Sequence, residues 1–371
     1  MSLILARLGL QQRVLPEYRL PFFAALAEAS PKGFSLFAGP ARLEESIAAV
    51  GSLPKNVHFT GADNHHFFGG PIYLCWQAGL IRWLEDWQPE VIILEANPRY
   101  LSNPAAQRWM HQRSRPVIGW GLGAPPVQGS FARMRSARRQ HFLFDFDALI
   151  TYSQRGAQEY RQVGFPADKI FVAANAVAAR PTWDMPVRPS QISGNKPVVL
   201  FVGRLQERKR IDLLIQACAG LPGHLQPDLW IVGDGPARAA LQGLALQVYP
   251  SAHFFGGRFG SELDAIFREA DLFVLPGTGG LAVQQAMSFG LPVMVAEADG
   301  TQADLVRPQN GWCLPAGDLD ALTSALQQAL EDIPLLRQMG QASYRIVVQE
   351  INLENMLQSF DQAVRSVWEG K

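Results

Sequence analysis

Short apolar runs recur along this chain, and each is followed by a longer stretch whose apolar residues have helical spacing. In the first half of the chain these runs lie at residues 91–94, 117–119, 148–151 and 170–173. Strands that consist of nearly continuous apolar residues are buried on both faces, as in parallel sheets with helices on either side. The pattern therefore predicts an α/β fold with a doubly wound, mainly parallel sheet.

The same pattern starts again in the second half of the chain, which predicts a second domain. Its apolar runs lie at residues 198–202, 229–232, 253–255, 272–275 and 293–296. Between the two series, residues 181–196 contain several prolines and little apolar periodicity, which is typical of a linker. We expect a first domain over residues 1–180, a linker over 181–196 and a second domain over 197–342. Residues 343–371 have helical spacing, and we expect this segment to cross back to the first domain.

The composition argues against several classes of protein. The 33 basic residues balance 33 acidic ones, so we expect no nucleic-acid partner. Cys75, Cys218 and Cys313 are too far apart to indicate a disulfide framework or a zinc site, and they fit a reducing compartment. The first residues lack the pattern of a secretion signal, so we expect a cytoplasmic protein. Residues 272–296 carry no charge, but prolines and glycines interrupt them, which predicts strand, helix and strand rather than a transmembrane helix.

The most specific segment begins at the strand predicted for residues 198–202. Gly203 and Arg204 follow that strand directly, and Lys209 follows a few residues later, before a predicted helix. Ligands of open α/β sheets bind beyond the carboxyl ends of the strands, so Arg204 and Lys209 are placed to neutralise a diphosphate. The alternative is a solvated basic surface, since Arg208 and Arg210 are adjacent in sequence.

A glycine-rich loop forms the second candidate site. Residues 276–280 contain Gly277, Thr278, Gly279 and Gly280, and a helix is predicted to start near Leu281. Glycines allow backbone N–H groups to approach a ligand, and a helix N-terminus favours an anion such as phosphate. A tight structural turn between strand and helix is the alternative.

Together these segments resemble the retaining GT-B glycosyltransferases of family 4, also called the glycosyltransferase group 1 family. The likeness covers the second domain: residues 198–214, 231–236, the strand end at Phe255 and Gly256, and residues 270–295. It implies GT-B architecture, with two Rossmann-like domains that face each other across a cleft. It also implies that Arg204 and Lys209 hold the donor diphosphate with the amides of residues 279–281, and that a base pocket lies near Phe255 and Gly256.

Two positions depart from the family pattern. Members usually carry two glutamates with seven residues between them along the loop and helix, and here those positions are Gly277 and Gln285. In the family the first glutamate contacts the transferred sugar and the second binds the ribose. Gln285 can still form hydrogen bonds to ribose hydroxyls, whereas Gly277 can offer only its backbone.

The first domain offers candidates for the acceptor side. Residues 12–22 look like the opening of polysaccharide-assembling members, and we expect Arg13, Tyr18 and Arg19 to face the cleft, with packing and surface roles as the alternative. A second candidate is Trp120, Gly121 and Leu122, where related sequences can carry a histidine at the position of Leu122. The prolines that follow exclude a dinucleotide-binding helix there, so we expect no nicotinamide cofactor.

Other polar clusters predict no metal site. The pairs Asp145 with Asp147 and Asp318 with Asp320 lie where helices end or begin, so capping and other structural roles are expected. His65 and His66 lack the spacing that places two ligands on one helical face. Residues 131–144 form a basic helix with apolar members, which predicts either contact with an anionic membrane surface or a solvated face.

The sequence thus predicts a metal-independent transferase without an organic cofactor, which moves a hexose-like sugar from a nucleotide diphosphate sugar to a glycan or lipid-linked acceptor. Retention of configuration is implied by the resemblance, as is transfer of the acceptor proton to the leaving phosphate. A cytoplasmic protein that lies at the inner face of the membrane is compatible with this activity. The alternatives are a sugar-nucleotide-binding protein without turnover and a sugar-nucleotide epimerase.

Overall fold

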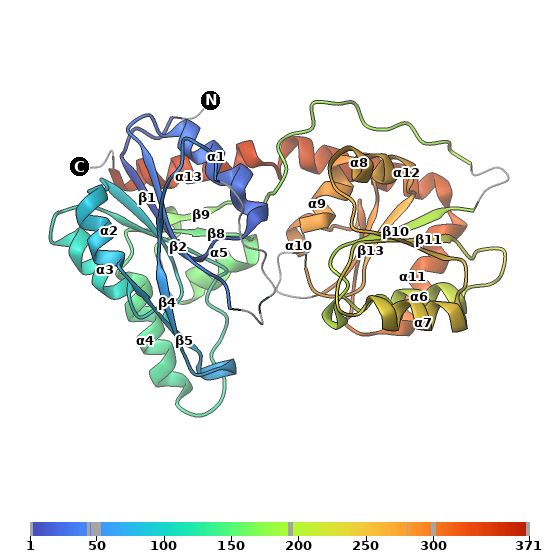
Figure 1. The fold of residues 1–371 in the computed structure, drawn as a ribbon, viewed down its shortest axis with the longest axis horizontal. Helices are drawn as coiled ribbons and strands as arrows, with labels where there is room; N and C mark the ends of the chain where they lie inside the picture. The colour runs from blue at the N-terminus through green and yellow to red at the C-terminus, as the bar shows by residue number, and fades with distance from the viewer. Residues whose placement is uncertain are drawn as a thin grey trace. The chain divides into compact units, whose positions relative to one another are not determined.

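The computed structural model describes residues 3–42, 45, 53–191, 196–279, 281–297 and 302–368. The chain forms two compact units (Figure 1). One comprises the chain up to Val177 together with the part from Leu353 onward, and the other comprises residues Ala178–Asn352. Each unit contains its own parallel sheet, so the predicted α/β class with two doubly wound domains is confirmed.

The first unit is built on a seven-stranded sheet with the order β3-β2-β1-β6-β7-β8-β9, in which every neighbouring pair is parallel. The strands are β1 (Leu8–Val14), β2 (Phe34–Gly39), β3 (His58–Gly61), β6 (Val91–Glu95), β7 (Val117–Gly121), β8 (Ala148–Thr151) and β9 (Ile170–Val172). The helices are α1 (Leu20–Ala29), α2 (Leu80–Trp87), α3 (Asn103–His111), α4 (Ala132–Phe144), α5 (Gln154–Gln162) and α13 (Leu353–Trp368). An antiparallel hairpin of β4 (Asp63–Phe67) and β5 (Leu74–Ala78) lies outside the main sheet.

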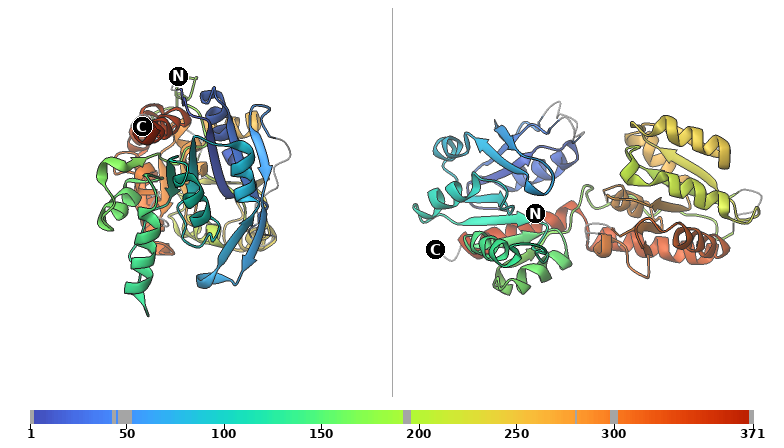
Figure 2. Two further views of the ribbon diagram at one scale, coloured as in Figure 1. Left: turned by 90° about the vertical axis from the view of Figure 1, so that its left-hand side faces the viewer. Right: turned by 90° about the horizontal axis from the view of Figure 1, so that it is seen from below.

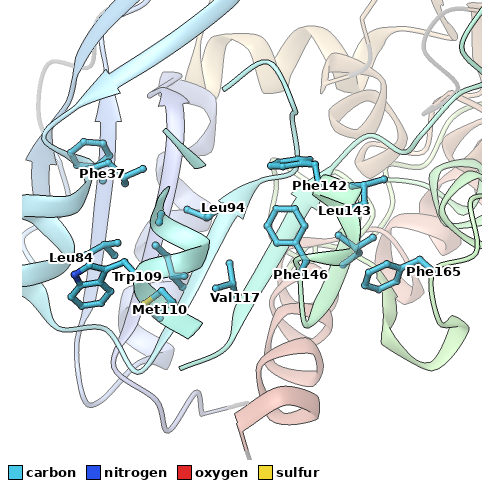
Figure 3. Close-up of a cluster of buried hydrophobic side chains, with 14 of the residues drawn as sticks. Phe37, Leu84, Leu94, Trp109, Met110, Val117, Phe142, Leu143, Phe146 and Phe165 are labelled. Carbon is cyan, nitrogen blue, oxygen red and sulfur yellow. The ribbon is translucent and has the colours of Figure 1, made fainter. Parts of the chain in front are cut away.

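Helices cover both faces of this sheet, as the apolar strands predict. On one face, Leu94 of β6 and Val117 of β7 belong to a buried cluster with Met110 of α3 (Figure 3). On the other face, the indole of Trp120 in β7 packs against Phe22 of α1 and Phe360 of α13, with ring centroids 5.8 and 5.0 Å away. Val117 and Trp120 are three residues apart in one strand, so their side chains point to opposite faces of the sheet. Strand β7 therefore contributes to the core on both faces.

The second unit has a six-stranded parallel sheet with the order β12-β11-β10-β13-β14-β15. The strands are β10 (Val198–Val202), β11 (Asp228–Val232), β12 (Ala252–Gly256), β13 (Leu272–Leu275), β14 (Val293–Ala296) and β15 (Gly311–Leu314). The helices are α6 (Ile211–Gly220), α7 (Arg238–Val248), α8 (Gly260–Glu269), α9 (Leu281–Ser288), α10 (Gln302–Leu305), α11 (Leu319–Glu331) and α12 (Ile333–Gln349). The uncharged stretch forms β13, α9 and β14, and no helix in the described residues is long and apolar enough to span a membrane.

The unit boundaries differ from the predicted linker and tail. Residues 181–191 belong to the second unit, because the guanidinium of Arg188 donates hydrogen bonds to the carbonyl oxygens of Phe267, Ala270 and Phe289 at 2.8, 2.7 and 2.9 Å. Helix α12 also stays with the second unit, and only α13 packs in the first. Residues 181–191 are therefore packed as part of the second unit, although their proline-rich composition predicts a linker.

Both points at which the chain passes between the units are held by one side chain of α9. Gln284 is 1% exposed; its Oε1 accepts a hydrogen bond from the N–H of Ala178 at 3.2 Å. Its Nε2 donates to the carbonyl oxygens of Ala178 and Ile351 at 3.3 and 2.9 Å. Ala178 follows the first passage directly, and Ile351 lies just before the second.

In each sheet the order of strands reverses beside one strand. In the first unit β1 lies between β2 and β6, and in the second β10 lies between β11 and β13. Ligands of doubly wound sheets bind beyond the carboxyl ends of the strands at such a switch point. Figure 2 gives two further views of the ribbon. The fold therefore places a candidate site at the ends of β1 and β6 and another at the ends of β10 and β13.

Candidate functional site

The two segments singled out in the second half of the sequence meet at the switch point of β10 and β13. The turn after β10 ends in a 3₁₀ helix, Glu207–Lys209, and the ammonium of Lys209 donates a hydrogen bond to the carbonyl oxygen of Thr278 at 2.7 Å. The N–H of Thr278 donates to the carbonyl oxygen of Arg208 at 3.0 Å. The basic turn and the glycine loop thus form one structure at the carboxyl edge of the sheet.

The glycines of this loop are required by the closeness of the basic turn. A Cβ atom at Gly277 would lie 2.3 Å from the carbonyl oxygen of Arg208 and 2.5 Å from the carbonyl carbon of Lys209. At Gly279, where φ is +128°, a Cβ atom would lie 2.2 Å from the ammonium nitrogen of Lys209. The family glutamate at the position of Gly277 therefore has no room in this loop conformation, which gives a physical reason for the departure.

The electrostatics of this edge favour an anion. Burial and then the neighbouring Arg208 lower the pKa of Lys209 to about 8. In the described part of the chain no carboxylate lies within ion-pair distance of its ammonium. The side chain of Arg204 is exposed at the same strand end, and α9 begins directly after the loop. Cations and a helix N-terminus at one place form a site to which a phosphate group can bind.

The remaining donor-side predictions lie around this edge. The N–H of Gly203 donates to the carbonyl oxygen of Val232 at 3.0 Å, so the turn after β10 is joined to the end of β11. The ring of Phe255 packs against Trp230 at 5.3 Å and is partly exposed, and Gly256 ends β12 with φ at +72°. Gln285 is half-buried on α9. Gly280 and the side chain of Leu281 lie outside the described residues, and the ligand roles of all these positions stay predictions.

At the other switch point, Arg13 of β1 meets Glu95 of β6. The N–H of Arg13 donates to Oε2 of Glu95 at 2.5 Å. The guanidinium of Arg13 points elsewhere and forms two hydrogen bonds to the carboxylate of Glu45, at 2.8 and 3.0 Å. Arg13 therefore has an internal anionic partner and is less available to a ligand than its sequence position suggests.

Arg19 is buried in an aromatic enclosure, so the alternative of a surface role for it is wrong. It is 8% exposed, and its guanidinium carbon lies 4.5 Å from the ring centroid of Trp120 and 5.1 Å from that of Tyr152. Nη2 donates to the hydroxyl of Tyr152 at 3.1 Å. The ring of Tyr18 lies 5.6 Å from the same guanidinium and is 44% exposed. Cation–π contacts of this kind stabilise a desolvated guanidinium.

Trp120 needs a correction as an acceptor contact. It is 1% exposed because it is packed between Phe22 and Phe360 and covered by Arg19, so its side chain belongs to the core and supports Arg19. Gly121 ends β7 and Leu122 is 57% exposed. These two residues, Arg13, Tyr18 and Arg19 remain predicted acceptor-side residues.

Glu95 is a polar residue of this site that the sequence pattern did not indicate. Burial raises its pKa to about 7, although the N–H of Arg13 and the charges of Arg13 and Arg19 oppose the rise. The available signal was a charged residue directly after the apolar run 91–94. Glu95 reaches the site only because β6 lies next to β1 in the sheet, and the sequence does not reveal this strand order.

The polar clusters set aside in the sequence have structural partners. Asp318 caps α11 by accepting a hydrogen bond from the N–H of Ala321 at 2.9 Å, as expected. Asp147 accepts from the N–H of Val117 at 2.7 Å. Within the described ranges, no three histidine, cysteine or acidic side chains come together in a way that could hold a metal ion.

The fold defines a class: two parallel-sheet α/β units, which is the GT-B architecture. One of the units carries basic side chains and a glycine loop at its switch point. Residues 187–346 match the family model described as Glycosyl transferases group 1, so this part of the chain is a domain of that family. The structure of Anabaena Alr3699/HepE in complex with UDP is similar to the whole chain, with a TM-score of 0.67 and 18% identity over 97% of this chain and 98% of that one.

Two curated relatives show the extent of the sequence similarity. The chain is 40% identical over 129 residues to a GDP-mannose-dependent alpha-mannosyltransferase of Mycobacterium tuberculosis (strain CDC 1551 / Oshkosh), which covers 34% of this chain and 32% of that protein. It is 24% identical over 311 residues to the lipopolysaccharide core biosynthesis glycosyltransferase LpsE of Rhizobium meliloti (strain 1021), covering 78% and 90%. The match thus spans about a third of the mannosyltransferase.

Proposed function

We propose that this protein is a glycosyltransferase that moves a hexose-like sugar from a nucleotide diphosphate sugar to a glycan or lipid-linked acceptor. The observation that carries the proposal is the position of Lys209: the residue is half-buried, and its ammonium lies on the glycine loop without a carboxylate partner in the described part of the chain. A desolvated cation beside a helix N-terminus binds an anion, and a diphosphate supplies one. The group 1 domain, the mannosyltransferase relative and the UDP complex of HepE support a nucleotide-sugar donor.

In the proposed reaction, the bond between the anomeric carbon and the diphosphate oxygen breaks, and a bond from the acceptor oxygen to that carbon forms. The acceptor proton passes to the departing diphosphate, which corresponds to retention of configuration. Arg204 and Lys209 stabilise the negative charge that develops on the diphosphate. Gln285 binds the ribose and the Phe255 and Gly256 region binds the base. The proposal includes no metal and no organic cofactor.

A panel of UDP-, GDP-, ADP- and TDP-sugars tests the proposal by release of nucleoside diphosphate with and without glycan acceptors. We expect one donor class to be turned over, and Arg204→Ala to lower its kcat/KM by about 10- to 100-fold through loss of a charge-assisted contact. The affinity for each donor is measured in parallel by calorimetry. Tight binding without release would support the non-catalytic alternative, and a product with an altered sugar but no transfer would support an epimerase.

We also propose that the first unit contacts an anionic membrane surface through α4, which would place the protein at the inner face of the membrane. Arg133, Arg135 and Arg138 are exposed on this helix, and Phe131 and Met134 beside them are 75% and 65% exposed. Helix α4 and the β4 and β5 hairpin extend from the same end of the first unit (Figures 1 and 2). The hairpin segment carries further exposed apolar side chains: Phe67, Phe68 and Ile72.

Sedimentation with vesicles of phosphatidylcholine, with and without phosphatidylglycerol, measures this contact. Each arginine near an anionic surface contributes about 1 kcal/mol, so replacing Arg133, Arg135 and Arg138 with glutamine is expected to weaken binding roughly 100-fold. The control replaces three exposed arginines on other helices of the same unit: Arg82, Arg108 and Arg161. Equal binding to neutral and anionic vesicles, or equal losses in both triple variants, would contradict the proposal.

A further inference from the structure

The switch point of the first unit contains a carboxylate whose hydrogen-bonding capacity is largely unused. Glu95 ends β6, and among the described residues its carboxylate receives one hydrogen bond, from the N–H of Arg13 to Oε2. A carboxylate has room for about four hydrogen bonds. The residue as a whole is half-buried, so it is not sealed from solvent.

The nearby cations do not form an ion pair with Glu95 in the described part of the chain. The guanidinium of Arg13 is held by Glu45, and that of Arg19 is enclosed by aromatic rings and bonded to the hydroxyl of Tyr152. Carboxylates in the interior of proteins are normally paired or fully hydrogen-bonded. Glu95 departs from this rule at the position where a doubly wound sheet binds its ligand.

The backbone around Glu95 is held by buried amides. Its N–H donates to Oε1 of Gln11 at 3.0 Å, and its carbonyl oxygen accepts from Nδ2 of Asn103 at 2.8 Å. Gln11 and Asn103 are both 0% exposed. These two bonds fix the backbone of Glu95 on both its N–H and its carbonyl side, which limits the directions that the carboxylate can take.

We propose that Glu95 accepts a hydrogen bond from the hydroxyl of the sugar acceptor, and that the acceptor is uncharged at this point. This inference rests on the proposed glycosyltransferase function and names the residue that would orient the acceptor. A phosphate or carboxylate group would be repelled by the Glu95 carboxylate, whereas a hydroxyl donates to it. In the transfer step the hydroxyl proton leaves to the departing diphosphate, so Glu95 orients the acceptor and is regenerated unchanged.

The charge of Glu95 makes the inference testable by pH. The charged or titratable groups that face it from neighbouring elements are Arg13, Arg19, Tyr100, Tyr152 and Cys75. Burial keeps the pKa of Glu95 at about 7 against the two arginines. Because only the ionised carboxylate is a strong acceptor, kcat/KM for the acceptor should rise as the pH increases through 7.

The test compares Glu95→Gln with the native protein. We expect the variant to lower kcat/KM for the acceptor by about 10- to 100-fold, to lose the rise through pH 7, and to keep its affinity for UDP and GDP within about twofold. Glu90→Gln is the matched control, because Glu90 precedes the opposite end of the same strand and pairs with Lys32. Melting temperatures of both variants check the fold.

A second measurement does not need turnover. The pKa of Glu95 is followed by NMR in protein labelled with ¹³C-glutamate, with and without neutral mannooligosaccharides. Hydroxyl groups of a bound sugar that donate to the carboxylate should lower this pKa. Normal transfer by Glu95→Gln with an unchanged pH profile would overturn the inference and leave the proposed function intact. A sugar-dependent shift without turnover of any donor would support the Glu95 site and count against the transferase, and absence of the shift would count against the site.

Discussion

Replacing Lys209 with methionine is expected to lower kcat/KM for the donor by about 100- to 1,000-fold, which is the usual effect of removing one group that stabilises transition-state charge. The methionine keeps the apolar stem that packs beside the glycine loop and removes only the ammonium. Nucleoside diphosphate release at varied donor concentration measures the effect. Arg258→Met is the control, because Arg258 pairs with Glu262 on the surface of the same unit at 3.6 Å.

The pH dependence distinguishes charge stabilisation from a packing role of Lys209. Its pKa is lowered to about 8, so the cation is present below pH 8 and is lost as the pH rises through that value. In the native protein kcat/KM for the donor should therefore fall above pH 8. Lys209→Arg should keep its activity up to higher pH, since a guanidinium stays charged. A pH profile that is the same in both proteins would contradict the assignment of Lys209.

Substitution of Gly277 with alanine is expected to lower the free energy of unfolding by about 1–3 kcal/mol, as overpacking of a tight contact does. The added Cβ would lie 2.3 Å from the carbonyl oxygen of Arg208, so the basic turn would have to move away from the loop. The rate of donor turnover should decrease as well, because Lys209 would move together with the basic turn. Gly277→Glu, which restores the family residue, should be at least as damaging.

Gly243→Ala is the control for this series. Gly243 lies inside α7, and a Cβ atom there has no neighbour within 4 Å, so the substitution should stabilise the protein by about 0.5–1 kcal/mol through helix propensity. Urea unfolding of the three variants gives the comparison. Native stability and turnover in Gly277→Ala would mean that the loop accommodates a side chain, and the steric explanation for the missing glutamate would then be wrong.

The sequence predicted what depends on local pattern. The buried strands and the two sheets follow from short apolar runs, and the basic turn and the glycine loop could be expected to share one sheet edge because each follows a strand. Strand order is a tertiary property, so the importance of Glu95 at the end of β6 could not be seen. The burial of Arg19 by Trp120 and Tyr152 also depends on residues more than 100 positions away in the sequence. Arg188 shows the same limit, since its four carbonyl partners turn an apparent linker into part of a domain.

The amide of Gln284 has a consequence for the way the two units are connected. Because its Nε2 is shared by the carbonyl oxygens of Ala178 and Ile351, the chain enters and leaves the second unit at adjacent points. In topological terms the second unit is a domain inserted into the first, whose sequence resumes with α13. Neighbouring ends are the geometry in which an inserted domain can be excised or circularly permuted. The segment 178–352 thus contains both residues that Gln284 holds together, Ala178 and Ile351. The first unit, in contrast, is completed only by the segments on both sides of this insertion.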